Sequence, residues 1–137
     1  MAEFYMKSLL EASGMGGDIH VSSAGVTEEK VGAQISIQAS RLLKKQGLVF
    51  WYKHARKLIK LDYELNDLLI AMDFSSMARA RIICGGDPEE KICMLMDFTE
   101  RPGSIVYPER TEDYSAAWAA LTEGCRGLLD HIKERGL

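Results

Sequence analysis

The sequence predicts an α/β domain, a three-layer sandwich in which helices cover both faces of a parallel sheet. The first observation is residues 67–73 (DLLIAMD), where five apolar residues lie between two carboxylates. Such a run is too short for an independent helix and is typical of a strand covered on both faces. The second observation is that the predicted elements alternate between helix and strand along the chain. Because ligands bind at the carboxyl edge of open α/β sheets, we expect a functional site near Asp73.

Length, charge and cysteine count limit the class of protein. The 137 residues suffice for one domain, which we assign to residues 1–137. The 47% hydrophobic content and the net charge of −3 indicate a soluble globular protein and favour neither nucleic acid nor membrane as a partner. The apolar runs are too short to span a bilayer, and the N-terminus has no signal-peptide pattern. An odd number of cysteines without framework spacing predicts reduced thiols and a cytoplasmic location.

The first part of the chain predicts a helix, a strand and a second helix. Residues 1–13 have helical spacing and end at a glycine-rich turn. Residues 18–23 alternate between apolar and polar, as a strand does, and a polar loop over 27–32 follows. The second helix ends at Gly47. The predicted apolar faces consist of Met1, Phe4, Tyr5, Leu9 and Ala12 in the first helix, and of Ile35, Ala39, Leu42, Leu43 and Gln46 in the second.

Residues 51–60 are basic and include Trp51 and Tyr52. One interpretation is a patch for an anion or nucleic acid, with rings that stack on bases. The acidic net charge favours a solvated loop whose aromatic side chains pack inward. Residues 61–66 predict a short helix or turn ahead of the central strand.

A third helix is predicted after the central strand. Asp73 or Ser75 is its candidate N-cap, and Gly85 with Gly86 ends it. We expect its inner face to consist of Met77, Ala80 and Ile83.

The last part of the chain predicts a strand, a long loop and a helix. Residues 91–96 (KICMLM) have the composition of a strand, and residues 97–110 that of a long loop, a feature that is usually functional or disordered. The last helix is predicted over residues 112–135, with acidic residues in its first turn and basic residues in its last. Its apolar residues recur at intervals of three and four: Tyr114, Trp118, Leu121, Cys125, Leu128 and Ile132.

Six short stretches resemble the low-molecular-weight protein tyrosine phosphatases, in the family's order and over nearly the whole chain. Residues 1–3 (MAE) are similar to the M-A-E that opens the family's first helix, directly after its phosphate-binding loop. Residues 71–73 (AMD) match the A-M-D that ends its third strand. The other stretches resemble the family's S-A-G, its G-I with A-R-x-L, the late loop of bacterial members, and the E-G-C of the last helix: residues 22–25, 47–48 with 55–58, 97–98 with 101–103, and 123–125.

The resemblance implies the family's fold and a phosphatase mechanism. In the family, a loop of pattern C-x-x-x-x-x-R precedes M-A-E. Its Cys thiolate attacks phosphorus, while its Arg and backbone N–H groups hold the phosphoryl oxygens. An Asp in a D-P pair on the late loop protonates the tyrosine leaving oxygen.

The sequence departs from this pattern at each catalytic position. The family's acid position holds Tyr107, and an unperturbed phenol is a weaker proton donor than a carboxylic acid. Where the family often has aromatics that hold the phosphotyrosine ring, this chain has Glu109 and Arg110, and residues 26–32 contain no aromatic. At the sixth position after each cysteine the sequence never has arginine: Glu90 follows Cys84, Thr99 follows Cys93, and His131 follows Cys125.

We therefore expect a phosphatase-family protein without phosphatase activity of its own, with no catalytic residue retained, no cofactor and no metal. One alternative is a fragment of an active protein tyrosine phosphatase whose true N-terminus lies upstream. Another is a non-catalytic binding protein on the same fold, with an unidentified phosphoprotein as partner. Translation of the gene ahead of Met1 separates the first two.

The predicted sheet has an unusual beginning. Doubly wound folds open with a strand, whereas this chain opens with a helix. In the family, the first strand lies in the middle of the sheet, between the second and third. A sheet without this strand has unpaired backbone groups or borrows a strand from another molecule. We therefore expect homo-oligomers that form through the incomplete sheet, or marginal stability.

Two other groups of residues have simple explanations. Cys84 and Cys93 have a partial similarity to the resolving pair of thioredoxin-linked arsenate reductases, but the first of those cysteines ends the third strand, and Cys84 lies a helix later. Thiols that face the core are the better interpretation. His20, His54 and His131 lie on separate elements without metal-ligand spacing, which predicts ordinary surface or packing histidines.

Overall fold

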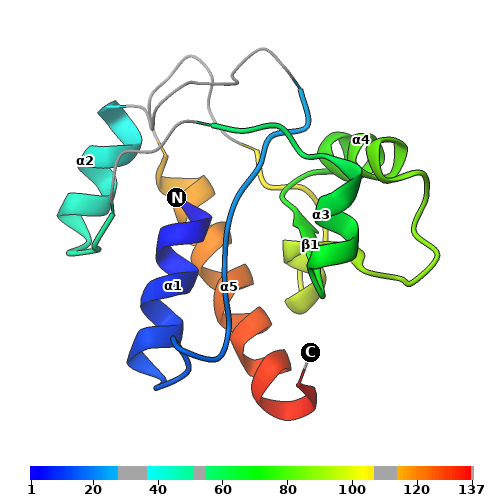
Figure 1. Ribbon diagram of the computed structural model, residues 1–137. Coiled ribbons are helices and arrows are strands. Elements are labelled where there is room, and N and C mark those ends of the chain that lie inside the picture. The colour runs from blue at the N-terminus through cyan, green and yellow to red at the C-terminus, as the bar shows by residue number, and fades with distance from the viewer. Residues whose placement is uncertain (28–36, 51–54, 107–113, 137) are drawn as a thin grey trace.

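The computed structural model describes residues 1–27, 37–50, 55–106 and 114–136 of the chain, and Figure 1 shows it as a ribbon. Helices lie on both sides of a small parallel sheet, as the predicted fold class requires. The elements in chain order are α1 (Ala2–Ala12), α2 (Ile37–Lys45), α3 (Lys60–Leu65), β1 (Leu69–Ala71), α4 (Phe74–Cys84), β2 (Ile92–Met94), the 3₁₀ helix η1 (Leu95–Phe98) and α5 (Ser115–Arg135).

The sheet of the described residues contains two strands. β1 pairs with β2 in parallel, with Leu69 opposite Ile92 and Ala71 opposite Met94. The predicted central strand is thus confirmed, although it is shorter than residues 67–73. The strand predicted over residues 91–96 is wrong at its end, because the Met94 N–H donates to Asp97 Oδ2 (3.0 Å) and the chain turns into η1.

Residues 18–23, predicted as a strand, do not form one. This segment contains no strand residue, and the bridge that follows it joins Gly25 to Lys57 in parallel. Alternation predicts which side chains face the core, but a strand also needs a neighbour with which to pair. The sequence predicted three strands, and the part of the chain that the structure describes contains two.

Apolar clusters pack on both faces of β1. The larger cluster lies among α1, α5 and η1, and Ile70 of β1 packs against it. The smaller cluster lies among α3, α4 and β2, and Leu69 packs against that one. Successive side chains of a strand point to opposite faces, so β1 separates the two clusters. The larger cluster consists of Tyr5, Met6, Leu10, Leu95, Met96, Ile105, Ala117, Leu121, Cys125, Leu128, Leu129 and Ile132.

The helix boundaries largely follow the sequence signals. The predicted cap of α4 is confirmed, since the Ser76 N–H donates to Asp73 Oδ1 (2.7 Å). Gly47 after α2 has φ 70° and Gly85 after α4 has φ 75°, both in the left-handed region that a residue with a side chain rarely adopts.

The buried faces of the helices agree only in part with prediction. On α1, Phe4 and Tyr5 are buried as expected, but Ala12 is exposed and Met6 and Leu10 are buried instead. The buried face of α1 is therefore rotated by part of a turn from the predicted one. On α5, the predicted residues Leu121, Cys125, Leu128 and Ile132 are all buried. Among the described residues, no helix is both long and apolar enough to cross a membrane.

Candidate functional site

The late loop returns to the carboxyl end of β1, where the sequence predicts a site. The Ile105 N–H donates to the Met72 carbonyl (2.8 Å), and the Phe74 N–H donates to Ser104 Oγ (2.9 Å). These two bonds fix residues 104–106 beside residues 72–74. Tyr107, the residue at the predicted acid position, follows Val106 directly and lies outside the described residues, as do Glu109 and Arg110.

Two exposed apolar side chains lie at this edge. Phe74 is 59% exposed and Val106 is 79% exposed. The carboxylate of Asp73 is already engaged as the cap of α4, so it holds the helix and does not project toward a ligand. The edge as described therefore offers contact surface and not a reactive group.

A buried carboxylate joins the start of α1 to the segment after it. Glu3 is 6% exposed, and its Oε1 accepts from Ser23 Oγ (2.6 Å) while its Oε2 accepts from Lys7 Nζ (2.6 Å). Both contacts are charge-assisted, which offsets the cost of burying the carboxylate. Glu3 and Ser23 belong to two different stretches that the sequence analysis singled out, and the structure brings them together.

Gly25 connects a second pair of these stretches. Its N–H donates to the Arg56 carbonyl (2.7 Å), and its carbonyl accepts from the Leu58 N–H (2.7 Å). Arg56 Nη1 in turn lies 3.1 Å from Asp62 Oδ2. That guanidinium hydrogen bond is the largest influence on Asp62 and lowers its pKa below the ordinary 3.8, together with the Ile59 N–H that donates to the same carboxylate.

The late loop and α5 are joined by an ion pair. Arg101 Nη2 donates to Glu123 Oε2 (2.6 Å), which connects the predicted loop residues 101–103 to the predicted helix residues 123–125. Arg101 has a side chain that is 79% exposed, so we expect this pair to contribute little to stability.

None of the three thiols lies in an environment that favours a thiolate. Burial raises the pKa of Cys93 to about 11 and that of Cys125 to about 12. Burial also raises the pKa of Cys84, with a further contribution from the negative charge of Asp62. A nucleophilic cysteine has a lowered pKa, because a nearby cation or helix N-terminus stabilises its anion.

The family of the chain follows from comparison with known proteins. A family model described as low molecular weight phosphotyrosine protein phosphatase matches residues 1–136. The chain belongs to this phosphatase family. It is 26% identical over 136 residues to low molecular weight protein-tyrosine-phosphatase YfkJ of Bacillus subtilis, covering 98% of this chain and 87% of that protein. The crystal structure of YfkJ matches with a TM-score of 0.92 at 25% identity, covering 99% of this chain and 87% of that one.

A second relative is a protein from an animal. The chain is 28% identical over 138 residues to low molecular weight phosphotyrosine protein phosphatase 2 of Drosophila melanogaster, covering 97% of this chain and 84% of that protein. The resemblance inferred from six short stretches is thus confirmed for the whole chain. In this phosphatase-family domain, Asp73 from these stretches caps a helix, and Glu3, Gly25 and Arg101 each join one segment to another.

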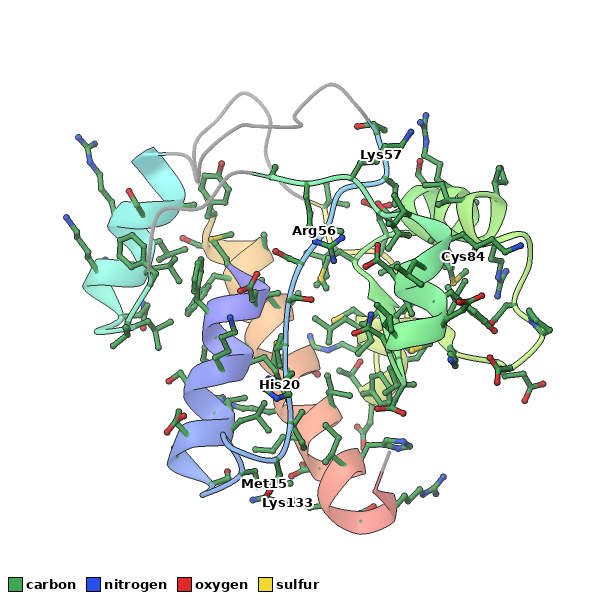
Figure 2. All side chains as sticks on the ribbon, in the orientation of Figure 1. Met15, His20, Arg56, Lys57, Cys84 and Lys133 are labelled. Atoms are coloured by element: carbon green, nitrogen blue, oxygen red, sulfur yellow. The ribbon has the colours of Figure 1, made fainter. Side chains whose placement is uncertain are left out.

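The structure also places the cysteines and histidines for which the sequence analysis preferred a core or surface role. Cys84 of α4, labelled in Figure 2, belongs to the smaller cluster, as does Ile92. Cys93 follows Ile92 on the strand and therefore points to the opposite face. Two thiols on opposite faces do not form a resolving pair. Among the described residues no group of histidine, cysteine and carboxylate side chains could hold a metal ion, and the His131 ring instead packs 5.0 Å from that of Phe98. His54 lies outside the described residues.

The sequence analysis missed a shallow depression on the surface of α5 and η1. Phe98, Glu123, Arg126 and Asp130 contribute to its lining. Neither β1 nor α4 contributes, so the depression is separate from the predicted site. The charged side chains that line it carry both signs, a pattern that gives no signal in sequence.

Proposed function

We propose that these 137 residues do not by themselves hydrolyse phosphate esters, and that this phosphatase-family domain acts by binding. The observation that carries the proposal is the state of its thiols. All three cysteines have a raised pKa and none has an arginine six positions later, so there is neither a thiolate to attack phosphorus nor a guanidinium to hold the phosphoryl oxygens. Without these groups no phosphoenzyme forms.

The position of the proton donor supports the same proposal. The family's acid position holds Tyr107, whose phenol ordinarily ionises near pH 10. Proton transfer to a leaving oxygen is most efficient when the pKa of the donor is near the working pH. The exposed Phe74 and Val106 leave the carboxyl edge of β1 suited to contact with a partner surface.

A second candidate is that the chain is part of an active protein tyrosine phosphatase. The specific observation in its favour is the match to YfkJ, with a TM-score of 0.92 but only 87% of that chain covered. In the family, the nucleophile loop precedes M-A-E. A segment that precedes Met1 and carries C-x-x-x-x-x-R would supply the missing thiolate and guanidinium.

Hydrolysis of p-nitrophenyl phosphate separates the candidates. We expect the purified 137-residue chain to show no turnover above a no-protein control. The same chain fused behind the segment that precedes the matching region of YfkJ tests the second candidate, and a Cys→Ser change in the fused loop is its control. Robust hydrolysis by the unfused chain would contradict the first proposal, and hydrolysis by the fusion that disappears in its Cys→Ser control would favour the second.

Thiol alkylation directly tests whether the three cysteines have a raised pKa. We expect iodoacetamide to modify the folded chain slowly at neutral pH and rapidly after addition of denaturant, because burial keeps the thiols protonated. Rapid modification of Cys93 or Cys125 in the folded chain would show that a reactive thiolate exists and would contradict the proposal.

A further inference from the structure

Helix α4 is apolar on two faces. Its inner face packs on α3, β1 and β2 and contributes Ala80 and Cys84 to the smaller cluster. Its opposite face carries three exposed apolar residues, each four positions after the last: Phe74, Ala78 and Ile82. Residues four apart lie one above the other on a helix, so these three form a continuous row, which we call the outer stripe of α4. A helix at the surface needs only one apolar face to join the core, so the fold of the described residues does not explain the second.

An arginine lies on each side of the outer stripe. Successive residues of a helix are rotated by about 100°, which places Arg81 to one side of the stripe and Arg79 to the other. Both arginines are exposed, and within the described part of the chain neither forms an ion pair. The helix itself contains no acidic residue. The acids before and after it, Asp73 and Asp87, already accept hydrogen bonds from backbone N–H groups.

The outer stripe is continuous with the apolar surface at the carboxyl edge of β1. Phe74 belongs to both, and its N–H donates to Ser104 Oγ (2.9 Å), which holds the late loop and the exposed Val106 beside the start of α4. Figure 1 shows α4 on the side of the sheet away from α1 and α5, so neither of these helices covers the stripe. An exposed apolar patch bordered by polar residues marks an interaction site, and arginine is enriched at protein interfaces.

We propose that the outer stripe of α4 binds an acidic amphipathic helix of a partner protein. The apolar face of that helix covers the stripe, and Asp or Glu side chains on both sides of that face pair with Arg79 and Arg81. From Phe74 to Ile82 the stripe is about 12 Å long, so two to three turns of the partner helix, about 12–16 Å, suffice to cover it. This inference rests on the proposed function, because it names the partner of a domain that acts by binding.

The charges of α4 select this partner over two other occupants. In a pair of α4 helices from two copies of this chain, parallel or antiparallel, arginine would face arginine, and like charges across an interface oppose binding. Anionic membranes are recognised by clusters of about four to eight basic residues. The stripe has two, on a chain whose net charge is −3. An acidic protein helix is the occupant that complements both the apolar stripe and its two arginines.

A pair of synthetic peptides tests the proposal. The probe is acetyl-Glu-Leu-Glu-Glu-Leu-Leu-Glu-Ala-Leu-Glu-Glu-Leu-Leu-Glu-amide, whose leucines lie on one face of a helix, and its control has lysine in place of every glutamate. We expect saturable binding of one acidic peptide per chain in fluorescence anisotropy, weakened by added salt. The basic peptide should bind at least about tenfold more weakly. Absence of saturable binding by the acidic peptide would overturn the proposal.

A charge exchange on α4 locates the binding site. The double variant Arg79→Glu with Arg81→Glu should bind the acidic peptide at least about tenfold more weakly than the parent chain and the basic peptide more tightly. The matched control is Arg126→Glu with Arg135→Glu, which makes the same change in net charge at exposed positions on α5 and should bind the acidic peptide like the parent chain. Equal losses in the two double variants would show that only net charge matters, which contradicts the proposal.

A single apolar change tests the stripe itself. Ile82 is 79% exposed and Val49, before the sheet, is 82% exposed, so neither Ile82→Ser nor Val49→Ser removes a buried side chain. We expect Ile82→Ser to weaken binding of the acidic peptide by about tenfold and Val49→Ser to leave it unchanged. Equal binding by the two variants would contradict the proposal.

Two further outcomes would assign the stripe to another occupant. A dimer of the parent chain that dissociates in Ile82→Ser would identify a second copy and overturn the proposal. So would binding to vesicles of phosphatidylcholine and phosphatidylserine that is lost when Arg79 and Arg81 are exchanged for glutamate, in a chain that does not bind the acidic peptide. Hydrolysis of p-nitrophenyl phosphate by the unfused chain would overturn the proposed function whatever the peptides do, so the two failures are distinguishable.

Discussion

Individual carboxylates organise the turns of this domain. Asp87, between α4 and β2, accepts from the Tyr63 hydroxyl (2.8 Å) and from the N–H groups of Lys91 (2.7 Å) and Ile92 (3.1 Å). Tyr63 is 5% exposed and its hydroxyl also accepts from the Glu89 N–H (2.8 Å). One aspartate thereby connects α3, the turn and the first residue of β2, which places β2 beside β1.

This arrangement makes stability depend on pH. Burial acts to raise the pKa of Asp87, but its hydrogen bonds outweigh burial and hold the pKa below the ordinary 3.8. The pKa of Asp62 is also lowered, mainly by Arg56. Groups with a depressed folded pKa stabilise above the unfolded pKa, and that stability is lost as pH falls through the folded value. We expect the free energy of unfolding to decrease as pH falls below about 4, with proton uptake on unfolding.

Urea unfolding between about pH 2.5 and about pH 6 measures this effect. Asp87→Asn should remove its share of the pH dependence, whereas Asp130→Asn, at an exposed position on α5, should leave the slope unchanged. A slope that is the same in Asp87→Asn and the parent chain would contradict the assignment.

At the residue scale, sequence predicts best where one side chain makes one local bond. The cap at Asp73 and the stop at Gly85 were predictable because each acts within a single turn of chain. The role of Asp87 was not, because its partners Tyr63 and Ile92 come from other elements. The conformation of Glu90 was not predictable either. Its φ of 55° lies in the left-handed region, where the sequence signal is usually a glycine.

At the scale of elements, helices were predicted better than strands. A helix satisfies its backbone internally, so periodicity suffices to locate α1 and α5, and the cap at Asp73 with the stop at Gly85 locates α4. A strand depends on a partner that is distant in sequence. Residues 18–23 alternate correctly and pack on the core, yet form no strand, and residues 95–96 leave the predicted strand because Asp97 captures the Met94 N–H.

The contact between α5 and η1 depends on two glycines of α5. A Cβ atom at Gly124 would lie 2.6 Å from Leu95 Cγ, and one at Gly127 would overlap the carbonyl oxygen of Phe98. Glycine normally weakens a helix, so two of them in the longest helix were unexplained by sequence. The structure explains them by the close approach of η1.

We expect Gly127→Ala to destabilise the domain although alanine favours helix. The clash is with backbone, which moves less easily than a side-chain tip, and overpacking of this kind costs about 1–3 kcal/mol. Gly17→Ala is the matched control, since a Cβ there meets nothing within 4 Å. Thermal unfolding monitored by far-UV circular dichroism should give a lower Tm for Gly127→Ala and little change for Gly17→Ala. A rise in Tm for Gly127→Ala would contradict this account of the packing.

At the scale of the whole molecule, the stretches that resemble the family maintain the frame. Glu3 with Ser23 and Arg101 with Glu123 connect segments about twenty residues apart in sequence, at separations of 20 and 22. The order of the six stretches along the chain was enough to recognise the family. In the fold, these two pairs of stretches contact each other. The chemistry of the family depends on other positions, so these stretches predict family membership, whereas the expectation of no phosphatase activity rests on the missing C-x-x-x-x-x-R pattern and on Tyr107.

Within the described part of the chain, the edge of β1 that points away from β2 has no bond at Ile70, and residues 20–24 make no backbone hydrogen bond, so these two edges predict self-association. Unpaired strand edges above partly buried apolar side chains favour pairing between molecules, because pairing satisfies backbone groups and removes apolar area from water. We expect the weight-average mass in sedimentation equilibrium to rise with protein concentration. Ser22→Lys places a charge on one edge and should weaken association by roughly tenfold, or about 1.4 kcal/mol. Ser75→Lys adds the same charge at an exposed position on α4 and should leave association unchanged. A chain that stays monomeric at every concentration, or an equal effect of both lysines, would show that these edges do not drive association.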